Sequence, residues 1–360
     1  MLKRLAICLL LASWLPAQSK NIVLITADGL RWQELFTGID PLLMNEKDAG
    51  MKDAAELRTR LWRETPEERR KALMPFFWGE LAARGVVYGN VKKGSSVRVT
   101  NGRRVSFPGY SEILTGRAND AQIKGNDHIQ NPNQTVLEFL KERLKLDRSQ
   151  VALFGSWETF HWIAEKTPGS IYINAGVREY DGPRASAKMR ELSRLQSLIL
   201  TPWGGERNDV FTFEMAMEYL QAVKPRVLFI SFGETDDWAH DKRYDRVLPL
   251  ITYFDRCLKE LFAALDSMPE YKGKTSVVIT SDHGRGSKLD DWSGHGEKIP
   301  EAAQIWLALF GPGTPTVGAV GEAANVPEIY QRDVTPTMIQ MMGIDPAEMK
   351  GILGKPIRTK

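Results

Sequence analysis

The sequence has little cysteine, no dominant charge and no long apolar run, and each lack excludes a class of protein. Only 2 cysteines stand among 360 residues, too few for a disulfide framework or a thiolate zinc cluster. With 48 basic and 45 acidic residues the formal charge is +3, so the strong positive field of a nucleic-acid-binding module is missing. Glycine and proline are dispersed, which excludes collagen-like and low-complexity segments. These features leave a globular protein of one large or two small domains.

The first residues have the pattern of an export signal. Lys3 and Arg4 precede a short apolar run, and a small-residue segment ends at Ala17. The apolar run is about ten residues, well short of the ~20 that a helix needs to cross a bilayer. We therefore expect residues 1–17 to be a cleaved signal peptide and residues 18–360 to be a periplasmic or secreted domain with no membrane span. An uncleaved anchor or a buried helix is the alternative.

Strand-like and helical segments alternate along the rest of the chain. Short apolar runs typical of buried parallel strands stand at residues 22–26, 151–155, 227–232, 276–280 and 305–310. Helices are expected at residues 66–84, 135–146, 207–223, 245–267 and 333–342. Residues 86–100 indicate a strand or hairpin. The alternation predicts an α/β fold with a mostly parallel central sheet and helices on both faces.

Two polar, irregular stretches, residues 37–65 and 175–206, interrupt this alternation. Sites of open α/β sheets lie beyond the carboxyl ends of the strands, so both stretches are candidate insertions over the active-site end. They are equally compatible with ordinary surface loops. An arginine-rich run at residues 58–71 also carries Glu64, Glu67 and Glu68, which indicates a solvated helix face and no nucleic-acid module.

Side chains that ligate metals follow three of the predicted strands. They are Asp28, Asp236, Asp237, His240, Asp282 and His283, with His295 twelve residues after His283. Imidazole together with carboxylate suits zinc and similar ions. One aspartate at a strand end is usually a turn or a helix cap. Several such groups on strands of one sheet predict a metal site.

Five short motifs occur in a distinctive order. They are Ile-Thr-Ala-Asp28-Gly-Leu-Arg, Ser106-Phe-Pro-Gly-Tyr, Asp236-x-x-x-His240, Thr-Ser-Asp282-His283-Gly and His295-Gly. As an ordered set they resemble the alkaline phosphatase superfamily, and most of all its nucleotide pyrophosphatase/phosphodiesterase branch. The motifs extend over residues 22–296, most of the chain.

The resemblance implies two divalent metal ions, with Zn²⁺ favoured over Mn²⁺ or Mg²⁺. One ion would be held by Asp28, Asp282, His283 and the oxygen of Ser106, and the other by Asp236, His240 and His295. By position alone Asp237 competes with Asp236, and the D-x-x-x-H spacing favours Asp236. Two such ions can clamp the entering and leaving oxygens of a displacement at phosphorus.

The resemblance also implies catalytic roles for Ser106 and Asn126. Ser106 would be the nucleophile that forms a phosphoseryl intermediate, and Asn126 would bind a phosphoryl oxygen. Without the metal pattern, Ser106 would be interpreted as a helix N-cap. The branch usually has Phe-Pro-Asn-His after its nucleophile, whereas Gly109 and Tyr110 stand there in this chain. This departure bears on the choice of substrate more than on the metal chemistry.

The expected function is hydrolysis of a small-molecule phosphoester by a metal-dependent enzyme of the phosphodiesterase or nucleotide pyrophosphatase type. A phosphomonoesterase of the same superfamily is the main alternative. A sulfatase would need Cys or Ser in a C/S-x-P-x-R context, and Tyr110 stands in place of that arginine. A phosphomutase would carry an inserted domain that is not obvious here. A catalytically inactive binding protein would lack a ligand, and every expected ligand position is filled.

Export leads to a direct prediction. Mass spectrometry of protein recovered outside the cytoplasm should show a mature N-terminus near Gln18, because signal cleavage follows the small-residue segment. Soluble cytoplasmic protein that retains Met1 would contradict it.

Overall fold

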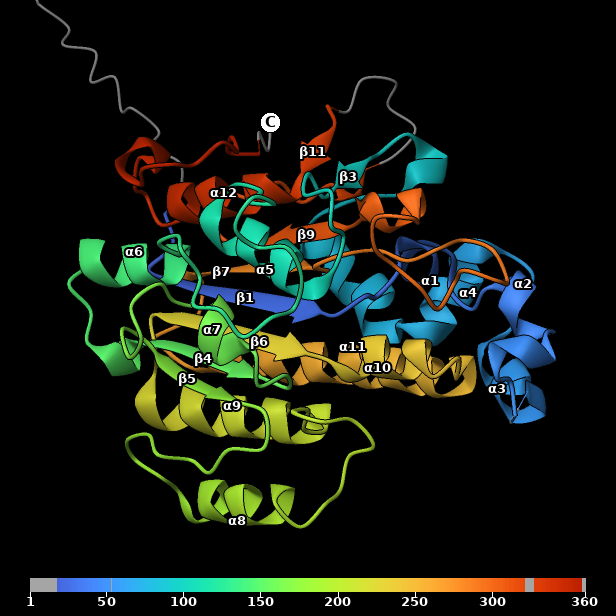
Figure 1. The fold of residues 1–360 in the computed structure, drawn as a ribbon, viewed down its shortest axis with the longest axis horizontal. Coiled ribbons are helices and arrows are strands. Elements are labelled where there is room, and N and C mark those ends of the chain that lie inside the picture. The colour runs from blue at the N-terminus through green and yellow to red at the C-terminus, as the bar shows by residue number, and fades with distance from the viewer. Residues whose placement is uncertain (1–17, 53, 321–326, 358–360) are drawn as a thin grey trace, which may run out of the picture.

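The computed structural model describes residues 18–52, 54–320 and 327–357 (Figure 1). The expected signal peptide, residues 1–17, lies outside these described residues. Within the described ranges, no helix combines the length and the apolar composition needed to cross a bilayer.

A sheet of eight strands forms the centre of the protein. In spatial order they are β10 (Gly318–Ala319), β2 (Gly85–Tyr88), β9 (Leu307–Phe310), β7 (Thr275–Thr280), β1 (Asn21–Ala27), β6 (Val227–Phe232), β4 (Val151–Gly155) and β5 (Tyr172–Ala175). Only β9 runs antiparallel to its neighbours among these strands. A small second sheet contains β11 (Ile329–Tyr330), β3 (Val97–Arg98) and β8 (Gln304–Ile305). The predicted mostly parallel α/β fold is confirmed.

Helices cover both faces of the large sheet (Figure 1). One hydrophobic core takes side chains from α1 (Trp32–Thr37), α2 (Pro41–Met44), α3 (Ala54–Leu61), α4 (Pro66–Leu73), α9 (Asp209–Val223), α10 (Glu234–His240) and α11 (Tyr244–Ser267). The other takes them from α5 (Ser106–Thr115), α6 (Val136–Arg143), α7 (Phe160–Ile163) and α12 (Val334–Met341). Helix α8 (Ala187–Gln196) packs outside α9 and forms an outer layer.

Strand β1 shows why the sequence has continuous apolar runs. Its side chains alternate between the two cores: Ile22 and Leu24 pack on the side of α5, whereas Val23 and Ile25 pack on the side of α11. Successive side chains of a strand point to opposite faces, so a strand covered on both sides must be apolar at every position.

The three strands at the middle of the sheet place the candidate ligands together. Strand β1 is paired in parallel with both β6 and β7, so all three end at the same edge of the sheet. Asp28 directly follows β1, α10 follows β6, and Asp282 stands two residues after β7. The polar ends of three buried strands therefore meet at one edge.

Several predicted elements have different bounds in the structure. The helix expected over residues 66–84 ends at Leu73, because Pro75 cannot donate a backbone hydrogen bond, and a π-helical turn follows at Phe77–Leu81. The backbone N–H groups of Phe76 and Phe77, left free by this break, donate to the carboxylate of Asp255 at 2.8 and 2.7 Å.

The single strand expected over residues 305–310 is divided between β8 of the small sheet and β9 of the large sheet. Other differences concern segments that were expected to be irregular or hairpin-like. Residues 86–100 do not form a hairpin, because β2 and β3 belong to different sheets. The stretches 37–65 and 175–206 contain short helices, namely α2, α3 and α8. Residues 37–65 have few apolar positions at helical spacing, so their sequence pattern does not predict helices.

Helix α5 lies unusually close to the segment that follows β7. A Cβ atom added to Gly109 would stand 2.4 Å from the carbonyl oxygen of Asp282, well inside van der Waals contact. Only glycine allows this approach without movement of one backbone. The same approach brings Ser106, the first residue of α5, next to the residues after β7.

Gly109→Ala should therefore disturb both stability and the site. We expect the free energy of unfolding to fall by about 1–3 kcal/mol, as for other overpacked positions, together with a loss of activity from displacement of Ser106. Urea unfolding and kinetic assays would measure both effects.

Gly79→Ala is the matched control, since nothing lies within 4 Å of a Cβ atom at that position. It should leave stability unchanged or raise it slightly, because alanine restricts the unfolded chain more than glycine does. Equal stability of the two variants would show that the approach of α5 imposes no constraint.

Candidate active site

The first group of candidate ligands is almost completely enclosed. Asp28 follows β1, and Asp282 and His283 follow β7; Asp282 and His283 are 0% exposed. The Nε2 atom of His283 lies 3.4 Å from Asp28 Oδ1 and 3.4 Å from Asp282 Oδ2. All three residues offer a ligand atom within 4.8 Å of the others.

The hydrogen-bonding pattern of this group leaves lone pairs that face one another. His283 Nδ1 lies 3.0 Å from the carbonyl oxygen of Gly284, so its hydrogen is on Nδ1 and Nε2 carries a lone pair. Asp28 Oδ1 and Asp282 Oδ2 are buried without a hydrogen-bond partner. Converging acceptors without a donor are unfavourable in a buried site, and a cation resolves them. This donor set therefore fits a metal ion.

The charges of the first group oppose one another when no cation is present. Burial, reinforced by the charge of Asp236, raises the pKa of Asp282 to about 8. Burial and the neighbouring charge of Asp282 raise the pKa of Asp28 as well. Burial lowers the pKa of His283, which keeps the imidazole neutral and able to bind a metal.

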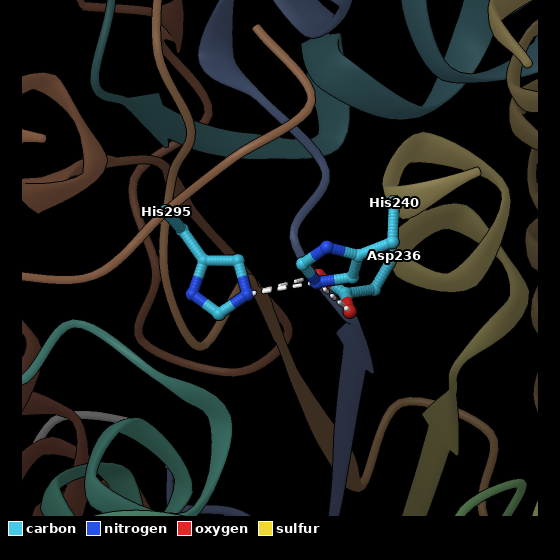
Figure 2. Close-up of side chains that lie close together, drawn as sticks. All are labelled: Asp236, His240 and His295. Atoms are coloured by element: carbon cyan, nitrogen blue, oxygen red, sulfur yellow. Dashed lines mark hydrogen bonds and ion pairs between the residues drawn. The ribbon is translucent and has the colours of Figure 1, made fainter. Parts of the chain in front are cut away.

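The second group consists of Asp236, His240 and His295 (Figure 2). Asp236 and His240 stand four residues apart on α10, so they share one face of the helix, and Asp236 Oδ2 lies 3.1 Å from His240 Nε2. His295 comes from a loop on the opposite side, and its Nε2 atom lies 2.9 Å from His240 Nε2. Its Nδ1 atom donates to the carbonyl oxygen of Arg104 at 2.9 Å, which turns the Nε2 lone pair toward the group.

The two groups are in contact and form one site. The rings of His283 and His295 are stacked with their centroids 3.8 Å apart. Asp236 Oδ1 lies 3.7 Å from His283 Nε2, so it faces the first group while Oδ2 faces His240. An arrangement of this kind fits two cations placed side by side.

Arg285, which sequence analysis did not single out, is part of the second group's surroundings. It is buried, and its guanidinium contacts both the side chain and the backbone carbonyl of Asp236. Although burial opposes the effect, the charge of Arg285 lowers the pKa of Asp236. The carboxylate therefore stays ionised and keeps a fixed orientation.

Ser106 begins α5 and points into the first group. Its Oγ atom lies 3.4 Å from His283 Nε2, and the side chain is 5% exposed. Its hydroxyl accepts no capping hydrogen bond within the helix, since the N-cap position is Val105. The N-terminus of a helix favours an anion. In the first turn of α5 the N–H of Phe107 is bonded to Asn126, Pro108 has no N–H, and the N–H of Gly109 is bonded to the carbonyl oxygen of Val105.

Asn126 lies against the same helix end. Its Oδ1 atom accepts a hydrogen bond from the backbone N–H of Phe107 at 2.9 Å. Because the carbonyl oxygen is occupied by this bond, the amide Nδ2 group is the part of Asn126 that can donate to a ligand. The side chain is exposed, so it stands at the opening of the site.

Tyr110, noted in the sequence only as a departure from the family pattern, fixes the position of Asp28 in the first group by a hydrogen bond. Its hydroxyl donates to Asp28 Oδ2 at 2.9 Å and accepts from Ser231 at 3.2 Å. Thr235 donates to the backbone carbonyl of Asp28 at 2.6 Å. One oxygen of Asp28 is thus held by tyrosine, and the other remains free for a metal.

The structure brings the predicted ligands together in the two groups that the resemblance implied, with Ser106 beside the first. Asp237, the competitor of Asp236, is not a member of either group. The contact with His240 is made by Asp236, whose Oδ2 atom lies 3.1 Å from His240 Nε2. Arg285 and Tyr110 act through contacts with distant residues, and their neighbours in the sequence carry no signal of those contacts.

Solved structures of several enzymes share this fold. The wild-type alkaline phosphatase PafA matches with a TM-score of 0.60 and 11% identity over 94% of this chain and 98% of that chain. A phosphonate monoester hydrolase from Silicibacter pomeroyi matches with a TM-score of 0.56 and 14% identity over 94% and 76%. A 2-O GAG sulfatase matches with a TM-score of 0.52 and 14% identity over 95% and 76%. At these identities the matches show the fold.

The fold is that of alkaline phosphatase-like hydrolases, and the two groups of carboxylates and imidazoles suit divalent metals. The model of the sulfatase family matches residues 20–344, so the chain belongs to the sulfatase family. No curated protein matches the chain. The nucleotide pyrophosphatase/phosphodiesterase branch is not singled out by these comparisons, and family membership alone does not assign the ester that is cleaved.

Metal removal should expose the charge repulsion of the first group. The raised pKa of Asp282, about 8 against 3.8 in an ordinary carboxyl group, means that metal-free folded protein binds more protons than unfolded protein between these values. Stability of the metal-free protein should therefore fall as pH rises, by up to about 1.4 kcal/mol per pH unit for one proton. Burial also raises the pKa of Asp209 to about 8, and this residue contributes to the slope with and without metal; the difference between the two slopes therefore reports on the ligand groups.

Chemical unfolding at several pH values, with and without chelator, would measure this effect. The metal-loaded protein should hold about two zinc-like ions per chain by elemental analysis and should show a shallower slope. Identical slopes before and after complete metal removal would argue against metal binding by Asp28 and Asp282.

Proposed function

We propose that this protein is a periplasmic or secreted metal-dependent phosphoester hydrolase that acts through a phosphoserine at position 106. The observation that supports it most directly is the position of Ser106 Oγ, 3.4 Å from His283 Nε2, at the edge of a buried set of lone pairs. The phosphodiesterase or nucleotide pyrophosphatase type is part of this proposal, with a phosphomonoesterase as the alternative. The candidate ligands are Asp28, Asp282, His283 and Ser106 for one ion and Asp236, His240 and His295 for the other.

The charge of the loaded site favours a phosphoester. The two groups contain three carboxylates and three imidazoles, and an imidazole binds a metal in its neutral form. Two divalent cations outweigh the three negative charges, and the buried guanidinium of Arg285 adds a further positive charge beside Asp236. A site with an excess of about two positive charges attracts the dianion of a phosphate monoester more strongly than a singly charged sulfate ester or phosphodiester, so this charge favours the phosphomonoesterase alternative.

The first chemical step is attack of Ser106 Oγ on phosphorus. The new bond joins Oγ to phosphorus, the bond from phosphorus to the ester oxygen breaks on the opposite side, and the proton lost by the serine is balanced by the one that the released alcohol takes up. Metal ions in the two groups would stabilise the ionised serine and the departing oxygen. The Nδ2 group of Asn126 can donate to another phosphoryl oxygen, because the Oδ1 atom of the same amide is occupied by the N–H of Phe107.

The second step restores the enzyme. Water attacks the phosphoserine, and Ser106 Oγ leaves and regains its proton. Asn126 holds the phosphoryl group in the same orientation during both steps, because its own side chain is fixed by the N–H of Phe107. Tyr110 keeps Asp28 in place by its hydrogen bond to Oδ2.

A sulfatase activity is the second candidate, favoured by the family match. Sulfatases of this superfamily convert a Cys or Ser in a C/S-x-P-x-R context into an aldehyde. Here the position of that arginine is taken by Tyr110, which is fully buried and bonded to Asp28. Tyr110 therefore supports a candidate metal ligand, and the chain lacks the arginine of the context in which a sulfatase serine is converted into an aldehyde.

Ser106→Ala should abolish most of the activity. We expect a loss of a thousandfold or more in kcat, because removal of the nucleophile removes the covalent route. Stability and metal content should change little, since every other ligand remains. Assays on an aryl phosphomonoester, an aryl phosphodiester and an aryl sulfate would show which ester is cleaved.

Ser111→Ala is the matched control, because Ser111 lies on the same helix and its hydroxyl contacts Asn131, away from the ligands. Acid quenching of the wild-type enzyme during turnover should trap phosphate on the peptide that contains Ser106. Wild-type kcat in Ser106→Ala, or the sulfate as the only ester hydrolysed, would overturn the proposed function.

A further inference from the structure

The loop of residues 100–105, which leads directly into Ser106, is held in place by side chains. The backbone N–H of Gly102 donates to Asp120 Oδ2 at 2.7 Å, and the N–H of Arg104 donates to Asn101 Oδ1 at 2.7 Å. Backbone donors outside regular secondary structure need acceptors of this kind, because an unpaired N–H group inside a protein is costly. The position of the loop therefore depends on a few polar side chains.

Glu112, on the same helix as Ser106, is the acceptor for the start of this loop. The carboxylate is 0% exposed. It accepts from the N–H and the hydroxyl of Thr100 at 2.9 and 2.7 Å, and from the N–H and Nδ2 of Asn101 at 2.8 and 2.9 Å. The backbone N–H of Arg332 adds a further hydrogen bond at 3.2 Å. A buried carboxylate with this many donors is well compensated, so it binds the loop firmly to α5.

Asn101 uses both ends of its amide and is 2% exposed. Its Nδ2 group donates to Glu112 Oε2, and its Oδ1 atom accepts from the N–H of Arg104. An amide that is bound at both ends has one orientation, because a flip would place donor against donor. Asn101 therefore connects Glu112 to the backbone of Arg104.

Arg104 has a backbone conformation that residues with a Cβ atom rarely adopt, with φ at 51°. Besides the bond from its N–H to Asn101, its guanidinium donates to the carbonyl oxygen of Glu297 at 3.0 Å. An unfavourable conformation of this kind persists only where the surroundings hold it, and it is found most often next to functional sites. Here it directs the carbonyl oxygen of Arg104 to His295 Nδ1, at 2.9 Å.

This contact determines how His295 presents itself to the second ligand group. With its hydrogen donated from Nδ1 to Arg104, the imidazole has its lone pair on Nε2, which lies 2.9 Å from His240 Nε2. Histidines that bind metals depend on the acceptor at their other ring nitrogen for orientation. A continuous set of hydrogen bonds thus leads from Glu112 through Asn101 and Arg104 to a candidate metal ligand.

We propose that Asn101 and Glu112 are positioning residues for His295 and thereby set the affinity of the second group for its metal ion. This inference rests on the proposed function, since it takes the second group to bind a metal. Arg104 and Ser106 are two residues apart, so one loop fixes both the acceptor for His295 and the candidate nucleophile. Its hydrogen bonds to Glu112 keep the second ion and Ser106 in a constant relative position.

The test is a calorimetric titration of metal-free protein with Zn²⁺, with the bound metal counted by elemental analysis. Asn101→Ala should weaken the binding of the second ion about tenfold or more, which is the usual effect of removing support from a metal-binding histidine. The affinity for the first ion should change by less than about threefold, because Asp28, Asp282 and His283 do not depend on this loop for their hydrogen bonds.

Glu112→Gln should cause the same selective loss, because it replaces one acceptor oxygen by an NH₂ group that faces the donors of Thr100 and Asn101. Glu112 is fully buried, so this variant is the more disruptive of the two. Asn101→Ala leaves the carboxylate and its other donors in place, and it decides the test alone should Glu112→Gln not fold.

Asp120→Ala is the matched control for a general loosening of the loop. Asp120 holds Gly102 of the same loop, but its other oxygen has no hydrogen-bond partner, so it does not lead on to Arg104. The melting temperature should fall in Asp120→Ala as it does in Asn101→Ala, whereas both Zn²⁺ affinities should be retained. A residue with a purely structural role would behave like Asp120.

Nuclear magnetic resonance of the imidazoles provides a readout that needs no metal. The chain has 5 histidines, so the Nδ1–H signal of His295 can be assigned by its loss in His295→Ala. In metal-free wild type and in Asp120→Ala this proton should be hydrogen-bonded and slow to exchange with water. In Asn101→Ala it should exchange faster, because the carbonyl oxygen of Arg104 is no longer held toward the ring.

Two results would overturn the inference. One is an unchanged affinity for the second ion in Asn101→Ala, and the other is an equal loss of that affinity in Asp120→Ala. Both leave the proposed function intact as long as the wild type binds two ions and hydrolyses an aryl phosphate. Wild-type protein that binds no Zn²⁺ would overturn the proposed function and this inference together, so the two failures are distinguishable.

Discussion

The repulsion among Asp28, Asp282 and Asp236 is the constraint on which the rest of the site depends. Three parallel strands end at one edge and deliver their carboxylates to a place where water is excluded. Such a cluster is stable only with compensating positive charge. Arg285 supplies part of it to Asp236, whereas Asp28 and Asp282 face a neutral imidazole. The ends of the sheet strands therefore form a site that is stable only with bound cations. The surrounding helices keep water away, so water cannot solvate the carboxylates in place of the cations.

Much of this arrangement could be predicted from the sequence, because its determinants are local. Each apolar run followed by an acidic residue predicts a buried strand with an acidic residue at its C-terminal end. Parallel strands place these ends at the same edge of the sheet. The four-residue spacing of Asp236 and His240 predicts that they share one face of a helix. The helix expected over 66–84 was too long for a local reason as well, since Pro75 stands inside it.

The features that could not be predicted arise from contacts between distant segments. Arg285 has no neighbour in the sequence that signals its contact with Asp236, 49 residues away. The same holds for Tyr110, which reaches Asp28 across 82 residues. The close approach of α5 at Gly109 depends on the relative position of a helix and a strand end, which periodicity does not report.

Arg285 makes the two ligand groups unequal before any metal arrives. The second group already contains an internal counter-ion, and His240 can place a proton between itself and Asp236 or His295. The first group has neither, and one oxygen of each of its carboxylates, Asp28 Oδ1 and Asp282 Oδ2, has no donor. The binding free energy of a cation should consequently be more favourable at the first group. We therefore expect two metal ions to bind in sequence, the first of them at the first group, beside Ser106. A calorimetric titration of metal-free protein would then resolve two binding steps of unequal affinity. Protein with one bound metal would already hold Ser106 in position before the second ion binds.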